Sequence, residues 1–188
     1  MTRVVLASGS PRRRELLREL GVEPVVRPAD IDETPGAREL PDALVARLAR
    51  TKAATITVDE TDLVIAADTV VAVDDDILGK PDDEAHAAAM LRRLSGTTHR
   101  VITGVHLRLG DADRHAVETT SITFRSLGDD EIEGYVATGE PMDKAGAFAI
   151  QGLAADFVTS IDGSRSNVVG LPLDVVVDLA AELGVTLS

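Results

Sequence analysis

Apolar and polar residues follow one another along this chain in two spacings, one typical of helices and one typical of strands. A short apolar stretch at Val4 leads through small residues to leucines at helical spacing over Leu16–Leu20, and Gly21 is a natural end for that helix. Apolar residues recur every three or four positions from about Pro41 to Thr57. This spacing predicts a second helix with one buried face.

The middle of the chain predicts strands between further helices. Leu63–Ala67 is a continuous apolar run, typical of a strand buried on both faces, and it ends at Asp68 before Val70–Val73 resumes the pattern. The three acidic residues that follow are expected to form the solvated tip of a tight turn. The later expected elements are a helix at Asp82–Leu94, a hairpin of His99–Leu109 and His115–Phe124, and helices at Asp129–Ala137 and Pro172–Leu183.

This order of elements predicts an α/β fold, and composition limits what the fold does. The 188 residues are enough for a substantial core, most simply one domain, 1–188, with two lobes around a cleft. Only three Phe and one Tyr are present and Trp is absent, so the core is built from aliphatic side chains. Scarce aromatic residues and a net charge of −13 both count against a nucleic-acid-binding protein.

The expected location is the cytoplasm, with no membrane association. The chain has no cysteine, which excludes disulfides and thiol catalysis and is compatible with a reducing compartment. Its first residues lack the pattern of a secretory signal, and no apolar run approaches the roughly 20 residues that span a bilayer.

Three arginines lie where the first helix is expected to begin. Ser10 is a good N-cap and Pro11 suits the first helical position, so Arg12–Arg14 fall in the first turn. The unpaired N–H groups of that turn carry partial positive charge, and cations added there need an anion among them. The pattern favours a phosphate-binding site, and the alternative is a solvated basic patch.

Lys52 and Asp68 are charged residues at positions where the pattern expects apolar ones. Lys52 lies on the apolar face of the second expected helix, so its ammonium points inward or extends from the edge of the buried face. Asp68 follows a buried strand, so it is expected to be paired with a cation, protonated, or at the mouth of a cleft. The alternative for Asp68 is a turn-capping role.

Three further polar residues have ordinary explanations from the residues alone. Glu33 lies in an acidic loop and could be surface charge, and Lys80 between Gly and Pro is a weak signal. Gln151 offers an amide donor and a carbonyl acceptor, which suits the edge of a pyrimidine base, but a glutamine in a turn commonly satisfies backbone groups.

Several motifs together resemble one known family. The runs LASGSPRRRELL, IAADTVV, LGKP, DKAGAFAIQG and NVVGLPL are similar to those of the Maf family of nucleoside triphosphate pyrophosphatases, and the likeness spans nearly the whole chain. The resemblance implies a Maf/inosine-triphosphatase-like fold, in which helices flank a central mixed twisted sheet. It also implies a possible homodimer and hydrolysis of a nucleoside triphosphate to the monophosphate and pyrophosphate.

The same resemblance assigns roles to residues of this chain. It makes Asp68 the base that accepts a proton from water, or a metal ligand, or both, and sequence does not separate these roles. Arg, Thr and Gln at positions 12, 69 and 151 match the branch acting on dTTP and UTP, with modified pyrimidine nucleotides as further candidates for housecleaning. The implied substrate-binding residues are Ser8, Ser10, Arg12, Arg13, Lys52, Thr69, Lys80 and Gln151, and the implied ligands of Mg²⁺ or Mn²⁺ are Glu33 and Asp68.

Two other functions stay open at this stage. The first is a nucleotide-binding regulator of cell division that senses a nucleotide without turnover, because binding and hydrolysis use the same side chains. The second is a pyrophosphatase acting on purine or modified purine triphosphates. A P-loop ATPase or kinase is disfavoured because the sequence lacks GxxxxGKS or GxxxxGKT.

Overall fold

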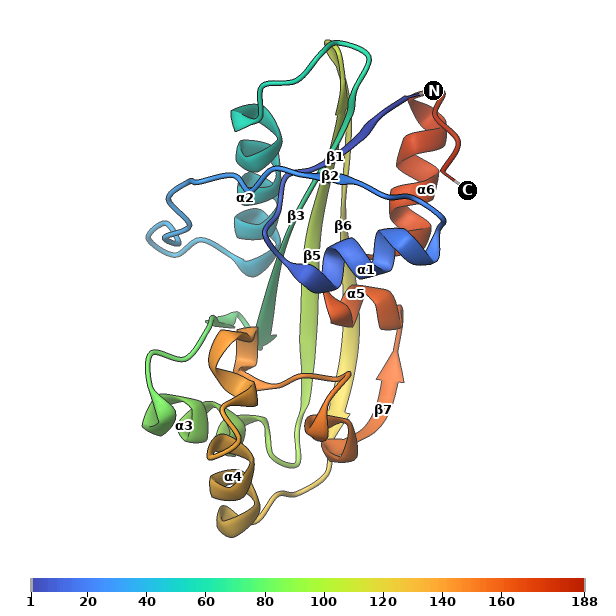
Figure 1. Cartoon of the computed structure of the whole chain (residues 1–188). Coiled ribbons are helices and arrows are strands. Elements are labelled where there is room, and N and C mark those ends of the chain that lie inside the picture. Colours follow the sequence, from blue (N-terminus) through green and yellow to red (C-terminus); the bar gives the residue numbers. More distant parts are fainter. Residues whose placement is uncertain (1, 188) are drawn as a thin grey trace. The chain divides into compact units, whose positions relative to one another are not determined.

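A mixed β-sheet forms the centre of the molecule in the computed structural model, which describes residues 2–187 (Figure 1). Seven strands of this part of the chain are hydrogen-bonded in the order β2-β1-β3-β5-β6-β7, with β4 paired to β3, and helices flank the sheet. The mixed α/β fold expected from the sequence is therefore confirmed. The strands are β1 Val4–Leu6, β2 Val25–Val26, β3 Leu63–Val73, β4 Asp76–Leu78, β5 Thr98–Leu109, β6 Ala112–Phe124 and β7 Val158–Asp162.

Five helices of the described residues lie where the apolar spacing predicts them, but Arg165–Val169 is a short helix where a loop and a strand-like Val168–Val169 were expected. Short 3-10 helices occur in the region between α4 and β7. The expected hairpin is present as β5 and β6, which are neighbours in the sheet. The helices are α1 Pro11–Glu19, α2 Pro41–Thr55, α3 Glu84–Leu94, α4 Asp129–Val136, α5 Arg165–Val169 and α6 Leu173–Glu182, and the 3-10 helices are η1 Glu140–Asp143, η2 Ala145–Ala147 and η3 Leu153–Phe157.

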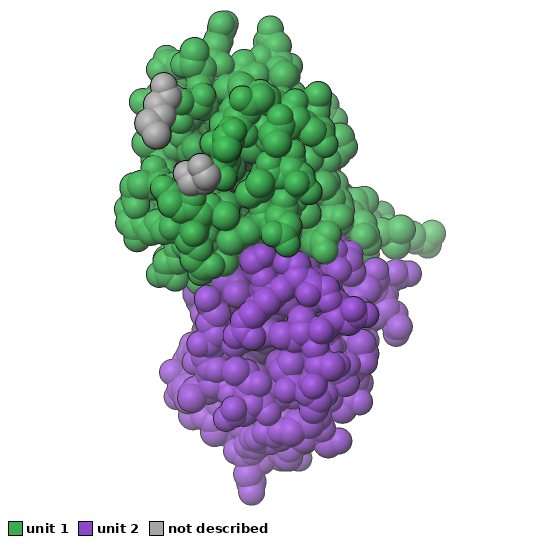
Figure 2. Space-filling view, turned by 90° about the vertical axis from the view of Figure 1, so that its right-hand side faces the viewer, with its two compact units in different colours: residues 1–68, 103–118, 170–188 green, residues 69–102, 119–169 purple. Residues whose placement is uncertain are grey.

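The chain divides into two compact units, coloured separately in Figure 2. Unit 1 takes the described residues of 1–68, 103–118 and 170–188, and unit 2 takes residues 69–102 and 119–169. Strands β3, β5 and β6 each contribute residues to both units.

In unit 1, β1 lies between two parallel partners. Val5 is in register with Val25 of β2 and with Val64 of β3, and β1 is buried along its whole length. Strands buried on both faces are typical of parallel sheets covered by helices. Small and aliphatic side chains of β1, β3, α2 and the residues directly after β1 and α2 pack together here, namely Val5, Ala7, Ala53, Ile56, Val64 and Ala66.

Helix α2 approaches β5 very closely in the same unit. A Cβ atom added to Gly104 of β5 would lie 2.3 Å from the carbonyl oxygen of Val45 in α2, so this position has room only for hydrogen. The apolar face of α2, including Val45 and Leu48, is buried. The glycine thus permits the depth at which α2 sits on the sheet.

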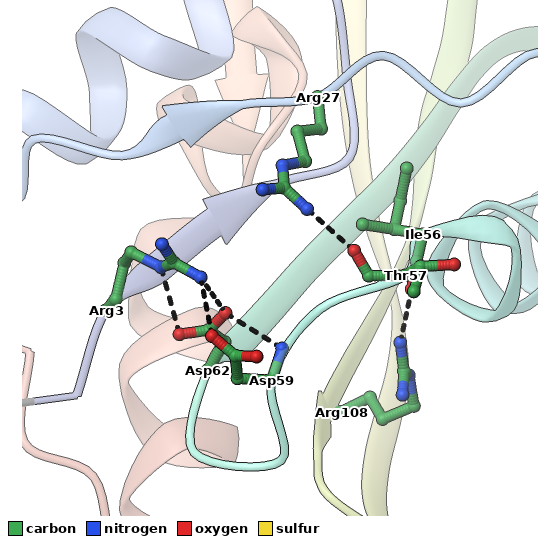
Figure 3. A network of polar contacts seen from close by, with 7 residues as sticks. All are labelled: Arg3, Arg27, Ile56, Thr57, Asp59, Asp62 and Arg108. Carbon is green, nitrogen blue, oxygen red and sulfur yellow. Dashed lines mark hydrogen bonds and ion pairs between the residues drawn. The ribbon is translucent and has the colours of Figure 1, made fainter.

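Arginines brace the loop that connects α2 to β3 (Figure 3). Arg27 Nη1 donates to the Thr57 carbonyl at 2.6 Å and Arg108 Nη2 donates to the Ile56 carbonyl at 2.7 Å. Arg3 forms an ion pair with Asp62, the buried carboxylate immediately before β3, and Arg3 Nε donates to its Oδ1 at 3.0 Å. The connection between these two elements is therefore fixed by hydrogen bonds at both of its ends.

In unit 2, β3 turns back into β4 and the aromatic residues gather in a core. Val71 pairs with Leu78 across an antiparallel turn, and the exposed turn residue Asp74 has a φ of +53°. The expected solvated tip of acidic residues is thus confirmed. Helices α3 and α4 contact each other over this core, whose aromatic rings are His99, Phe124, Tyr135, Phe148 and Phe157.

Candidate active site

The three arginines at the start of α1 have separate environments. Arg14 is on the surface, where its Nη2 lies 2.5 Å from Glu23, a residue that also pairs with Arg18. Arg12 is half-exposed and makes no hydrogen bond or ion pair within residues 2–187. Arg13 is half-buried and donates hydrogen bonds to Ser8 and to the Gly170 carbonyl. Of the three arginines, Arg12 and Arg13 therefore stay candidates for binding an anion such as phosphate.

Arg13 links the turn before α1 to the segment before α6. Its Nε donates to the Gly170 carbonyl at 2.8 Å and its Nη1 donates to Ser8 Oγ at 3.1 Å. Burial lowers the pKa of this guanidinium, and the negative charges of Asp68 and Glu33 act in the opposite direction. Arg13 is therefore close enough to both carboxylates for their charges to interact.

Ser8 and Ser10 shape the turn that precedes α1. Ser10 occupies the expected N-cap position and Pro11 begins the helix, but the Ser10 hydroxyl makes no capping hydrogen bond. Instead the Ser10 amide donates to the buried Ser8 Oγ at 3.2 Å. The Ser8 hydroxyl thus serves both the turn and Arg13.

Lys52 joins two carboxylates in unit 1. The lysine, on the buried face of α2, is only 7% exposed, and its Nζ lies 2.6 Å from Asp68 Oδ1 and 2.6 Å from Glu33 Oε1. Helical spacing left two orientations of this side chain open, and the structure shows the inward-pointing one. Asp68 lies in β3 and Glu33 lies in the loop before α2, so Lys52 Nζ connects side chains from a helix, a strand and a loop.

Asp68 lies inside a continuous strand, which corrects the sequence interpretation. The apolar run was expected to end at Asp68, with a turn-capping role as the alternative, but β3 continues through this position to Val73. The side chain is buried, and burial raises its pKa even though Lys52 and Arg13 favour the charged form. A carboxylate fits within this strand because Lys52 is its ion-pair partner.

The other predicted site residues belong to unit 2. Thr69 is half-buried in β3 directly after Asp68, whereas Lys80 and Gln151 are exposed. Lys80 follows Gly79, whose carbonyl accepts a hydrogen bond from the Gly146 amide at 3.0 Å. Roles for these three residues together with the unit 1 cluster remain predictions.

Glu140 and Tyr135 organise the turn that carries Gln151, and sequence reasoning did not single them out. Tyr135 Oη donates to Glu140 Oε1 at 2.9 Å and accepts from the Ala149 amide at 3.1 Å. Glu140 Oε1 also accepts from the Leu153 amide at 3.1 Å. A signal was available in the one tyrosine of a chain poor in aromatic residues, because a buried hydroxyl needs a partner.

A family model described as "Maf-like protein" matches residues 3–183. The chain belongs to the Maf family. Two relatives agree with this over nearly their full length, and both carry the name dTTP/UTP pyrophosphatase. The one from Anaeromyxobacter sp. (strain Fw109-5) is 51% identical, over 97% of this chain and 90% of the relative, and the one from Myxococcus xanthus (strain DK1622) is 51% identical, over 99% and 95%.

The fold of this chain is similar to that of a solved structure from another group of proteins. The Staphylococcus aureus Ham1 protein superposes with a TM-score of 0.53 at 17% identity, covering 97% of this chain and 99% of that one. At this level of identity the likeness concerns the fold alone.

None of the helices in residues 2–187 has the length and hydropathy of a membrane-spanning segment.

The carboxylates of this Maf chain fit a hard divalent cation. The Glu33 and Asp68 oxygens contact the same Lys52 nitrogen, so they are separated by at most twice its 2.6 Å contact distance. Residues 2–187 contain no group of three or more histidine, cysteine or acidic side chains arranged to hold a metal. Two carboxylates with phosphate and water oxygens are a typical set of ligands for Mg²⁺.

Proposed function

We propose that this protein hydrolyses dTTP and UTP to the nucleoside monophosphate and pyrophosphate. The observation that carries the proposal is the contact of the buried Lys52 with Glu33 and Asp68, within electrostatic range of Arg13 at the start of α1. Cations and acids concentrated in this way suit a polyphosphate with a divalent metal. The names of the relatives that are about half identical over nearly the full length support the same reaction.

The reaction needs a held phosphate chain and a base. Arg12, Arg13 and Lys80 bind phosphate oxygens and stabilise the negative charge that develops on the leaving pyrophosphate. Asp68 accepts a proton from the water that attacks the α-phosphorus, and the bond from that phosphorus to the bridging oxygen breaks. The raised pKa of the Asp68 carboxyl makes it a stronger base than an exposed aspartate.

The proposal includes a divalent metal. When bound by Glu33 and Asp68, Mg²⁺ or Mn²⁺ would offset phosphate charge and orient the α-phosphate. Asp68 has two carboxylate oxygens, so the proposal gives it both the base and the ligand role.

Arg12, Thr69 and Gln151 provide the preference for thymine and uracil in this proposal. A purine or an amino-substituted pyrimidine would leave polar groups of these side chains without partners, which is costly when they are desolvated.

The family resemblance also supports a homodimer, which the elution volume of the purified protein in size-exclusion chromatography would test.

A panel of triphosphates tests the reaction and its specificity. Pyrophosphate release is measured with dTTP, UTP, dCTP, ATP, dGTP and ITP, each with Mg²⁺, with Mn²⁺ and with EDTA. We expect dTTP and UTP to react at least about tenfold faster than the purines, and EDTA to stop the reaction. Hydrolysis in ¹⁸O-labelled water should place the label in the monophosphate, because water attacks the α-phosphorus.

Each contrary result would overturn a different part of the proposal. Purine turnover as fast as that of dTTP would remove the pyrimidine assignment and favour the purine-acting alternative. Nucleotide binding without pyrophosphate release, with every metal, would instead identify a sensor. Label recovered in pyrophosphate would contradict the proposed site of attack.

A further inference from the structure

The Lys52 ammonium lies between the two carboxylates that would hold a metal. It contacts Asp68 Oδ1 and Glu33 Oε1, both at 2.6 Å, and its side chain is only 9% exposed. A metal ion bound to both of these oxygens would occupy the position that the Lys52 ammonium occupies in this structure. Lys52 and a metal ion therefore compete for the same pair of ligands.

The negative charge of this pair is already offset by basic side chains. Glu33 and Asp68 supply two negative charges, which Lys52 offsets in direct contact and Arg13 through electrostatic attraction. Arg47 also interacts electrostatically with Asp68, and Arg12 lies within electrostatic range of Arg13. A divalent cation arriving alone would meet no excess negative charge there and would be repelled by the basic side chains. A triphosphate brings the negative charge that removes this repulsion.

We propose that Lys52 exchanges partners during the reaction cycle. In the nucleotide-free protein it holds Glu33 and Asp68, and it moves to the phosphate chain when a divalent cation arrives together with the triphosphate. This inference rests on the proposed function, and it adds that the metal enters as its complex with the nucleotide. The lysine is then a positioning residue before binding and a phosphate ligand after it.

The side chains differ in mobility in a way that suits the exchange. A lysine carries a compact charge on a flexible four-carbon stem, so it can move between partners without moving α2. The side chain of Glu33 is 55% exposed and lies in a loop, whereas that of Asp68 is 10% exposed within β3. One ligand is therefore fixed and the other is free to adjust as the ammonium leaves.

Binding of Mn²⁺ without nucleotide tests the exchange. Free Mn²⁺ is followed by electron paramagnetic resonance during titration of the full-length wild-type protein, Lys52→Met and Lys52→Gln, with circular dichroism to confirm that each variant is folded. We expect the wild type to bind Mn²⁺ weakly, and both uncharged variants to bind it on the order of tenfold more tightly, because the competing charge is gone.

Two further variants make the result specific. Lys144→Met is the matched control, because Lys144 also pairs with an acidic residue, Asp143, yet contacts neither carboxylate of the cluster, and it should bind Mn²⁺ as the wild type does. Adding Glu33→Gln to Lys52→Met should return the affinity to the weak wild-type value, since one of the two ligands is then lost.

Equal or weaker Mn²⁺ binding by both Lys52 variants would overturn the exchange. Tighter binding that survives Glu33→Gln would overturn it as well, because the metal would then lie elsewhere. Pyrophosphate release from dTTP by the same wild-type preparation keeps the two proposals distinguishable. Turnover with unchanged Mn²⁺ affinity in the variants contradicts the exchange alone, and tighter Mn²⁺ binding without turnover contradicts the proposed function alone.

Discussion

Asp68 is an acidic residue whose surroundings act on its charge in opposite directions. Burial in β3 favours the neutral form and raises the pKa of the carboxyl, while Lys52 and Arg13 favour the ionised form. The direct contact to Lys52 at 2.6 Å supplies the partner that a buried carboxylate needs. The Asp68 carboxyl is thus buried and can still ionise, as a group that accepts a proton in catalysis must.

Much of this cluster could be predicted one residue at a time. Helical spacing placed Lys52 on the apolar face of its helix, pointing inward or extending from the edge. The apolar context indicated that Asp68 is paired with a cation, protonated, or at the mouth of a cleft. Their pairing was not readable, because it depends on how α2 packs against β3. Glu33 lies in a loop without regular structure, so no helical or strand spacing could predict the position of its side chain.

His99 provides a prediction at the scale of one residue. It is 1% exposed, neither ring nitrogen has a hydrogen-bond partner among the described residues, and burial lowers the pKa of the imidazole from 6.5 to about 4. The folded protein therefore binds this proton less readily than the unfolded chain does. Its stabilising contribution is complete above pH 6.5 and is lost as the pH falls towards 4, by about 3 kcal/mol in all.

Urea unfolding of the wild type and His99→Leu at several pH values checks this. The free energy of unfolding of the wild type relative to the variant should fall by about 2 kcal/mol between pH 7.5 and pH 5, because only the wild type carries this group. A constant difference across that range would show that His99 is protonated as easily in the folded protein as in the unfolded chain.

At the scale of elements, strands and helices with strong apolar patterns were predictable and irregular segments were not. The helices α1, α2 and α3 and the β5–β6 hairpin follow their apolar spacing. The interruption expected in β3 was wrong, because an ion pair from another element accommodates a charge that the pattern counted as a strand end. The 3-10 helices η1, η2 and η3 lie in a region rich in small residues, where packing rather than periodicity sets the backbone.

Gly104 carries a prediction about the seat of α2. Replacement by alanine would place a methyl group 2.3 Å from a backbone oxygen of α2, and backbone cannot move aside as a flexible side chain can. We expect Gly104→Ala to lower the free energy of unfolding by about 3 kcal/mol, in the upper range for overpacking. It should also slow pyrophosphate release, because α2 carries Lys52.

A second glycine gives the matched control for this variant. Gly134 lies in α4, is exposed, and a Cβ atom there would meet nothing within 4 Å. Gly134→Ala should leave turnover unchanged and stabilise the helix by up to about 1 kcal/mol, since alanine is the better helix former. Thermal unfolding and dTTP turnover of both variants are the measurements. Equal stability for the two would contradict the close approach of α2 and β5.

At the scale of the whole molecule, the family match and the composition agree on the kind of protein. The motifs that resemble the Maf family are spread along the chain, and the family model covers residues 3–183. A net charge of −13, together with Arg12 and Arg13 in the first turn of α1, suits a small anionic substrate better than a nucleic acid. The division into two units agrees with the two lobes expected from the sequence.

Pyrophosphate release from dTTP by Asp68→Asn, compared with Asp62→Asn, tests the central claim most directly. Both aspartates are buried in unit 1 and paired with a basic residue, but Asp62 pairs with Arg3 outside the proposed site. We predict that Asp68→Asn lowers the rate by at least about 10²-fold while the protein stays folded, and that Asp62→Asn, although less stable, stays near the wild-type rate at moderate temperature. A folded Asp68→Asn variant with a near-normal rate would contradict the account.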